Sequence, residues 1–285
     1  MPDADALFSG RDLCFCGIHT HDMPTAIMMV YTKDGFVVAS DGQGNRPNGI
    51  KTTRERKIAP IVGPHWVFVL GFYGTASLVD ANGNDAFQTI YDNTTALLAK
   101  RDFKELTEYA RLFSQVVAPR LNPDVRLRSP FLLPDSDVIE SKLYLHLHFA
   151  GYFKNKPMMC SYRIDFFNDR PTVRVLKDCG IAHVRQYIVE GSSKVMARVM
   201  CDNSGFFKTR RNVGLEKLWR HGNNNLSLKE AGDAVRSYIQ VCKTSEAKIE
   251  DPENCNFIGG DTYVATITPE NGFKGEWETD PASSS

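Results

Sequence analysis

The stretch TAIMMVYTKDGFVVASDGQGN, residues 25–45, decides the fold because it is typical of two strands joined by a tight turn. Its two apolar, β-branched runs flank a turn signal centred on Asp34. In a hairpin, residues equally far from the turn face each other, which puts Thr25 opposite about residue 43. Asp41 is then a near neighbour of Thr25 in the sheet.

A second hairpin follows in the run from Lys57 to Gly71. Its turn is Gly63-Pro64, and its second strand, residues 66–70, is a continuous apolar run of the kind that is buried on both faces. The same counting from the turn places Lys57 beside Gly71. Each hairpin therefore ends in one pair of groups. The first places a hydroxyl near a carboxylate, and the second places an ammonium group near a glycine amide.

The rest of the chain alternates between helical and strand patterns. Apolar spacings of three and four predict helices, and β-branched or aromatic runs predict strands. The predicted helices are 75–100, 103–118, 193–201 and 228–243, and the predicted further strands are 143–152, 158–167, 172–176, 182–189 and 262–268. This order predicts an α+β fold, a four-layer αββα sandwich of two antiparallel sheets flanked by helix pairs.

The composition excludes several classes of protein. Lys plus Arg, 34, balances Asp plus Glu, 34, so no overall field attracts the chain to nucleic acid or to an anionic membrane. No apolar run approaches the roughly 20 residues that span a bilayer, and residues 1–24 lack a signal-peptide pattern. We therefore expect a cytoplasmic protein whose seven cysteines are reduced thiols.

The grouped residues suit nucleophilic catalysis. A threonine at a free N-terminus carries a candidate base in its own α-amine. A lysine ammonium would favour the alkoxide, an aspartate would hold that lysine charged, and a glycine N–H would bind the oxyanion. Thr25, Asp41, Lys57 and Gly71 could fill these roles. The alternatives for them are a strand threonine, a structural ion pair and close strand packing.

TAIMMVYTKDGFVVASDGQGN, RERKIAPI and VFVLGFYGTA resemble the start of a proteasome β-type subunit, a threonine N-terminal-nucleophile hydrolase, in a bacterial form. The resemblance implies that Thr25 becomes the nucleophile when residues 1–24 are removed. VEGSSKVMARV resembles the same family's turn into its third helix. That resemblance implies that Ser192 orients the amine, although Ser192 could also simply cap the helix.

The family resemblance also implies a binding site for the residue before the cut. The positions that would border it are Gly44, Asn45, Glu55, Ala59, Val69, Tyr73 and Ser77. The implied reaction is peptide-bond hydrolysis through an acyl-enzyme, without a cofactor or metal. The implied partners are a peptide or unfolded-protein substrate, further copies of the chain in a ring or stack, and an unfoldase.

The chain departs from the family pattern at two places. Pro24 stands where processed subunits usually have glycine, and its fixed φ restricts the turn needed for self-cleavage. Cys255 and Ile258 stand where active members have an aspartate and a serine, and Asp251, Asn254 or Ser193 could substitute for them. We expect a leader at 1–24, a hydrolase domain at 25–270 and a polar tail at 271–285.

Two other functions remain open. One is a non-catalytic ring or scaffold subunit that keeps its leader, and the other is an amidohydrolase that acts on small amides with the same nucleophile. One candidate group of metal ligands is His146 and His148, which share one strand face but have no third ligand nearby in the sequence. A second group, Cys14, Cys16, His19 and His21, lies in the leader. We expect no metal at either place, and no nucleic acid at the basic stretch 209–222.

Overall fold

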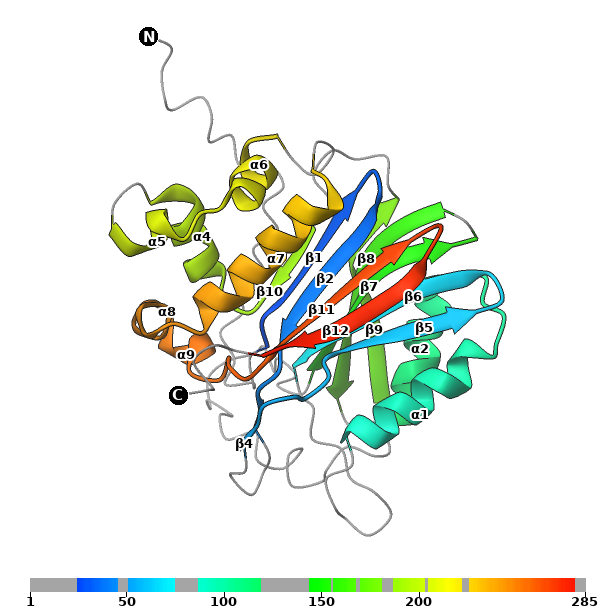
Figure 1. Cartoon of the computed structure of the whole chain (residues 1–285). Coiled ribbons are helices and arrows are strands. Elements are labelled where there is room, and N and C mark those ends of the chain that lie inside the picture. Colours follow the sequence, from blue (N-terminus) through cyan, green and yellow to red (C-terminus); the bar gives the residue numbers. More distant parts are fainter. Residues whose placement is uncertain are drawn as a thin grey trace, which may run out of the picture.

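The computed structural model describes residues 25–45, 51–74, 87–118, 144–154, 156–167, 170–180, 187–202, 205–221 and 226–279. These residues form an α+β fold with two five-stranded antiparallel sheets, a two-stranded ribbon and two groups of helices (Figure 1). Among the described residues, no helix is both long and apolar enough to cross a membrane.

The first sheet contains the hairpin that begins at Thr25. Its strands, in spatial order, are β10 (Tyr187–Glu190), β1 (Ile27–Thr32), β2 (Gly35–Asp41), β11 (Thr262–Thr268) and β12 (Gly272–Glu278). Ile27 lies opposite Ser40, so Asp41 is level with Ala26, one residue from the register expected. The turn needs glycine, because Gly35 has φ 143° and a Cβ there would lie 2.3 Å from the carbonyl oxygen of Ile267.

The second sheet contains the hairpin that follows Lys57. Its strands, in order, are β5 (Ile58–Gly63), β6 (Trp66–Gly74), β7 (Tyr144–Phe153), β8 (Lys156–Phe167) and β9 (Arg170–Gly180). Ile58 lies opposite Gly71, so Lys57 is level with Phe72. The ribbon between the two hairpins consists of β3 (Gly44–Asn45) and β4 (Lys51–Thr52).

Each sheet carries its own helices (Figure 1). The helices α1 (Phe87–Ala99) and α2 (Leu106–Val117) pack on the second sheet. The first sheet is covered by the C-terminal helices α4 (Ser193–Cys201), α5 (Gly205–Thr209), α6 (Val213–His221), α7 (Leu228–Cys242), α8 (Ser245–Glu250) and α9 (Pro252–Cys255). The predicted N-cap of α7 is confirmed: Ser227 and Glu230 form a capping box.

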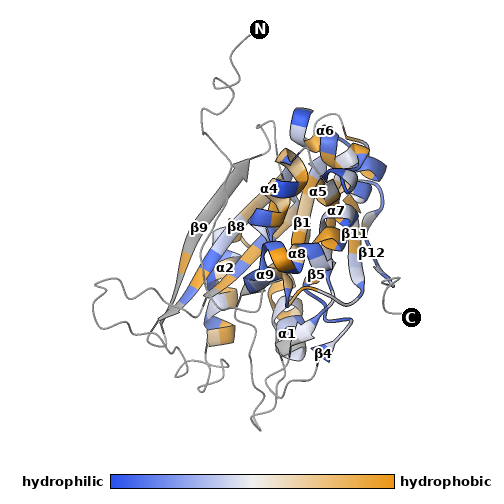
Figure 2. Cartoon of the chain, turned by 90° about the vertical axis from the view of Figure 1, so that its left-hand side faces the viewer, coloured by the Kyte–Doolittle hydropathy of each residue, from blue (hydrophilic) through white to orange (hydrophobic). Residues whose placement is uncertain are grey.

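Three hydrophobic clusters hold these parts together. One lies between α1, α2 and the second sheet, and one between the C-terminal helices and the first sheet. The third joins residues of both sheets, including Ile27 and Met29 of β1, Val69 of β6, and Ala150 of β7. Figure 2 shows hydrophobic residues along β1 in the interior and mixed colouring on the amphipathic outer helices.

The structure adds elements that the predicted helices and strands do not include. Helices α5 and α6 lie in or beside the basic stretch 209–222, and α8 and α9 lie between Ser245 and Cys255, because apolar residues such as Leu215 and Ala247 are buried against the core. Residues 272–278, expected within a polar tail, form the edge strand β12 paired with β11. The first predicted helix is described only from Phe87 onwards, since residues 75–86 lie outside the described part.

Candidate active site

A buried ion pair forms the centre of the candidate site. Lys57 Nζ lies 2.9 Å from both carboxylate oxygens of Asp41, and the two residues are 5% and 0% exposed. The carboxylate also accepts hydrogen bonds from the backbone N–H groups of Ala26 (2.9 Å), Gln43 (3.2 Å) and Gly259 (3.2 Å). These bonds compensate the buried charge and fix the end of β2 against the start of β1.

Thr25 is buried at the start of β1, directly before the residue whose amide binds Asp41. Continuing the β1 registers by two positions puts Gly42 on one side of Thr25 and Ser192 on the other. Close packing supports this neighbourhood, since a Cβ at Gly191 would lie 3.2 Å from the carbonyl oxygen of Thr25. The structure therefore brings Thr25, Asp41, Lys57 and Ser192 into one region.

Gly71 lies differently from what was expected. The N–H of Phe72 donates to the carbonyl of Lys57, the residue before β5, at 3.2 Å. Because successive amides of a strand point to opposite neighbours, the N–H of Gly71 points toward β7, where His148 is its register partner. Along β6, the next backbone N–H that points to the same side as that of Phe72 belongs to Gly74. Gly74 is the last residue of β6, and at this end β6 extends beyond the first residue of β5.

Ser192 caps a helix and binds a buried carboxylate. Its hydroxyl accepts from the N–H of Val195 at 3.0 Å and donates to Asp251 Oδ2 at 2.5 Å. Asp251 is 1% exposed, and the same oxygen accepts from Asn254 Nδ2 at 2.9 Å. Ser192 therefore caps the helix, as the alternative interpretation expected, and it also binds Asp251. Asp251 lies four residues before Cys255, the position aligned with the family's aspartate.

Tyr238 of α7 holds the segment that carries Ser192. Its hydroxyl donates to the carbonyl of Glu190 at 2.8 Å and accepts from the N–H of Ser192 at 3.1 Å. Burial raises the pKa of Tyr238 well above its usual range, so the hydroxyl keeps its proton for this role. By contrast, Cys255 and Ile258 are fully buried in the cluster beneath the C-terminal helices.

Among the expected substrate-binding residues whose side chains the structure describes, Ala59 and Val69 do not line one pocket. Ala59 packs toward α1 and α2, whereas Val69 lies between the two sheets, because their side chains are on opposite faces of the second sheet. Glu55 lies close to Gly44 and accepts from Thr52 Oγ1 at 2.9 Å. The side chains of Asn45 and Tyr73, and all of Ser77, lie outside the described part.

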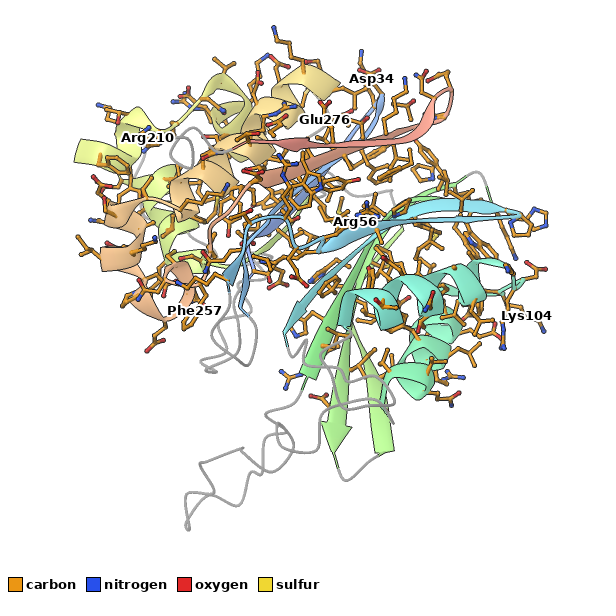
Figure 3. The ribbon with its side chains drawn as sticks, turned by 60° about the horizontal axis from the view of Figure 1, so that its bottom comes forward. Asp34, Arg56, Lys104, Arg210, Phe257 and Glu276 are labelled. Carbon is orange, nitrogen blue, oxygen red and sulfur yellow. The ribbon has the colours of Figure 1, made fainter. Side chains whose placement is uncertain are left out.

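Two further features surround the site. The guanidinium carbon of Arg56, the residue before Lys57, lies 5.9 Å from the ring centroid of Tyr263, where β5 approaches β11 (Figure 3). Glu190, a residue that the sequence analysis did not select, lies beside His146 and His148. The leader ligands Cys14 to His21 lie outside the described residues.

No protein-family model matches the chain. No curated protein matches it either.

Solved structures do match. An Anbu (Gly-1) mutant from Hyphomicrobium sp. strain MC1 is 14% identical with a TM-score of 0.51, over 90% of this chain and 88% of that one. Anbu from Yersinia bercovieri, described as an ancestral beta-subunit, is 12% identical with a TM-score of 0.48, over 90% and 89%. Anbu from Pseudomonas aeruginosa, solved as a helical assembly, is 14% identical with a TM-score of 0.48, over 90% and 87%.

The Hyphomicrobium mutant structure corrects the assignment made from the sequence. At 14% identity, the Hyphomicrobium match shows a shared fold and no more. The residues that carried the resemblance to a proteasome β-type subunit lie mainly in the first two hairpins, whose spacing follows from the fold itself. The prediction of a proteasome β-type subunit is therefore wrong, and the chain has the fold of Anbu structures.

Proposed function

We propose that this chain is an N-terminal-nucleophile hydrolase in which Thr25 is the nucleophile of a threonine-type endopeptidase. The observation that carries the proposal is the buried Lys57–Asp41 pair, whose carboxylate also binds the amide next to Thr25. A charged lysine fully enclosed at the end of two hairpins, beside a buried hydroxyl residue, is an arrangement suited to nucleophile activation.

Self-processing would create the nucleophile. The Oγ of Thr25 attacks the carbonyl carbon of Pro24, the peptide C–N bond breaks, and the α-amine of Thr25 is released as the acyl group moves to oxygen. Water then hydrolyses this ester, which frees residues 1–24 with a new carboxylate and leaves Thr25 at the N-terminus. The division into a leader at 1–24, a domain at 25–270 and a segment from 271 is part of this proposal.

Turnover would use the same atoms. The α-amine of Thr25 takes the hydroxyl proton as Oγ attacks the substrate carbonyl, and it returns a proton to the leaving amine. Lys57 stabilises the developing alkoxide and Asp41 keeps Lys57 charged. Asp251, acting through Ser192, is proposed as the positioning residue for the amine. For the oxyanion, the amide of Gly74 is better oriented than that of Gly71.

The proposal extends to the layers of the fold, the location of the enzyme, its substrates and its self-association. The three hydrophobic clusters support a four-layer αββα sandwich of the N-terminal-nucleophile type. We propose a cytoplasmic enzyme that cleaves peptides or unfolded proteins, with an unfoldase that unfolds the substrate proteins. Self-association into rings or stacks would use exposed apolar residues such as Ile249, 82% exposed, and Phe257, 41% exposed and visible on the outside in Figure 3.

The mass of the purified chain tests the proposal most directly. We expect the intact mass to correspond to residues 25–285, with a free threonine amine that reacts with a β-lactone or epoxyketone probe. A stable, folded chain that retains residues 1–24 after prolonged incubation would contradict the proposal. Probe labelling of Thr25 without cleavage of any peptide in a fluorogenic panel would instead favour the small-amide hydrolase.

Asp251→Asn is expected to lower kcat about 100-fold with little loss of stability. Asparagine keeps the oxygen that accepts from Ser192 and Asn254 and removes only the negative charge. The pH profile of kcat should also shift to lower pH, because a nearby anion raises the proton affinity of the amine. The measurements are kcat across pH and thermal unfolding. A surface control, Glu253→Gln in the same short helix, should change neither, and an unchanged pH profile for Asp251→Asn would exclude the positioning role.

A further inference from the structure

We propose that His146, His148 and Glu190 form a binding site for a divalent transition-metal ion, with Zn²⁺ as the best fit. One ligand atom from each residue can be chosen so that all three lie within 4.8 Å of one another. Two imidazoles and one carboxylate form a donor set that binds zinc and leaves a coordination position open. The hard ions Mg²⁺ and Ca²⁺ prefer oxygen ligands, so they fit this set poorly.

The spacing of the ligand atoms favours tetrahedral coordination. His148 Nε2 lies 3.4 Å from Glu190 Oε1, and His146 Nδ1 lies 3.7 Å from the same oxygen. A tetrahedral ion with bonds of about 2.0–2.1 Å holds its ligand atoms about 3.4 Å apart. The two separations from Glu190 are therefore close to the edges of such a tetrahedron. The ligand atoms of the two histidines lie within 4.8 Å of each other, and side-chain rotation would bring them to the same spacing.

His148 is prepared for binding by its other nitrogen. Its Nδ1 lies 2.8 Å from Ser161 Oγ, whereas its Nε2 is buried, has no hydrogen-bond partner and faces Glu190. When Nδ1 carries the proton and donates it to Ser161, the lone pair of Nε2 points toward the carboxylate. Metal-bound histidines are commonly fixed by a hydrogen bond of this kind from the second ring nitrogen.

The protonation states agree with this geometry. Burial lowers the pKa of His148 to about 4, so the imidazole is neutral and able to bind a cation at neutral pH. Burial alone would raise the pKa of Glu190, but the neighbouring His146 and His148 outweigh burial and lower that pKa. The nearest cation on β8, Arg163, is paired with Asp165 at 2.7 Å.

The site would connect the two sheets next to Thr25. His146 and His148 belong to β7 of the second sheet, whereas Glu190 ends β10 of the first sheet and pairs with Ile27. Two residues after Glu190 the chain reaches Ser192. A bound ion would therefore fix the end of β10, and with it the segment beside the proposed nucleophile, against the opposite sheet. Glu190 is partly exposed, which leaves a route for the ion.

Metal binding by the full chain tests the inference without any measurement of hydrolysis. After treatment with a chelator and dialysis, the chain should take up one equivalent of Zn²⁺, and its unfolding midpoint should rise by several degrees. Co²⁺ in place of Zn²⁺ should give the intense visible absorption of a tetrahedral nitrogen and oxygen site. Mg²⁺ should have neither effect.

Matched variants assign the site. His148→Asn and Glu190→Gln should weaken Zn²⁺ binding at least about 100-fold, and Ser161→Ala about 10-fold. The exposed controls His65→Asn and Glu276→Gln should bind as the unaltered chain does. If His148→Asn fails to fold, Glu190→Gln and Ser161→Ala still decide the question. Uptake of less than about 0.1 equivalent of Zn²⁺ by the full chain would overturn the inference. Equal Zn²⁺ affinity in the site variants and the controls would overturn it too. Both outcomes are independent of whether Thr25 is catalytic.

Discussion

Replacing Thr25 with alanine is expected to leave residues 1–24 attached and to lower peptide hydrolysis by at least about ten-thousand-fold. Without Oγ the chain loses the atom that attacks the carbonyl of Pro24 and the atom that forms the acyl-enzyme, so both reactions stop together. Intact mass and the hydrolysis of fluorogenic peptides measure the two effects separately. The serine variant Thr25→Ser retains a hydroxyl and should still be processed, although more slowly.

A buried threonine at the far end of β1, Thr32, provides the control. Thr32 Oγ1 donates to the carbonyl of Gly35 at 3.1 Å and accepts from the N–H of Asp34 at 3.2 Å. Thr32→Ala should lower the free energy of unfolding by about 1 kcal/mol while processing continues. If Thr25→Ala hydrolysed peptides as fast as the unaltered chain, or if Thr32→Ala blocked processing equally, Thr25 would have no special role.

The local features of this fold could be predicted from the sequence. The turn signal at Asp34 and the apolar runs beside it predict the first hairpin. Counting along the two hairpins does not bring Asp41 to Lys57; only the family resemblance implied that they share a site, and the structure shows their contact. The register was less accurate, because the exact turn residues set it: Ala26 is level with Asp41, and Phe72 with Lys57. That difference of one or two positions decides which way the amide of Gly71 points.

Long-range contacts could not be predicted in the same way. Glu190 and His148 are far apart in the chain and meet only because β10 and β7 lie in sheets that face each other. Asp251 was one of several possible substitutes for the missing family aspartate, and only the short helices after Thr244 bring it to Ser192. No local periodicity marks such pairs, since the side chains of separate elements meet through tertiary packing.

Lys57→Met is expected to lower the free energy of unfolding by about 3 kcal/mol and to abolish processing. Methionine fills much of the same volume, but it leaves Asp41 as a fully buried carboxylate whose remaining partners are backbone amides. Chemical unfolding gives the stability, and intact mass reports the processing. As a control, Arg220→Met removes an exposed ion pair with Glu216 and should cost less than about 0.5 kcal/mol.

A double variant separates the structural role of this pair from its chemical role. In Lys57→Met with Asp41→Asn, no charge stays buried, and the side-chain oxygen of asparagine can accept from the N–H of Ala26. Its NH2 group then replaces the oxygen that accepts from Gln43 and Gly259. Part of the lost stability should therefore return. Processing should remain absent, because no ammonium group favours the alkoxide of Thr25. A double variant that recovered both stability and processing would mean that the ion pair only supports the fold, whereas recovery of stability alone assigns Lys57 to the chemistry.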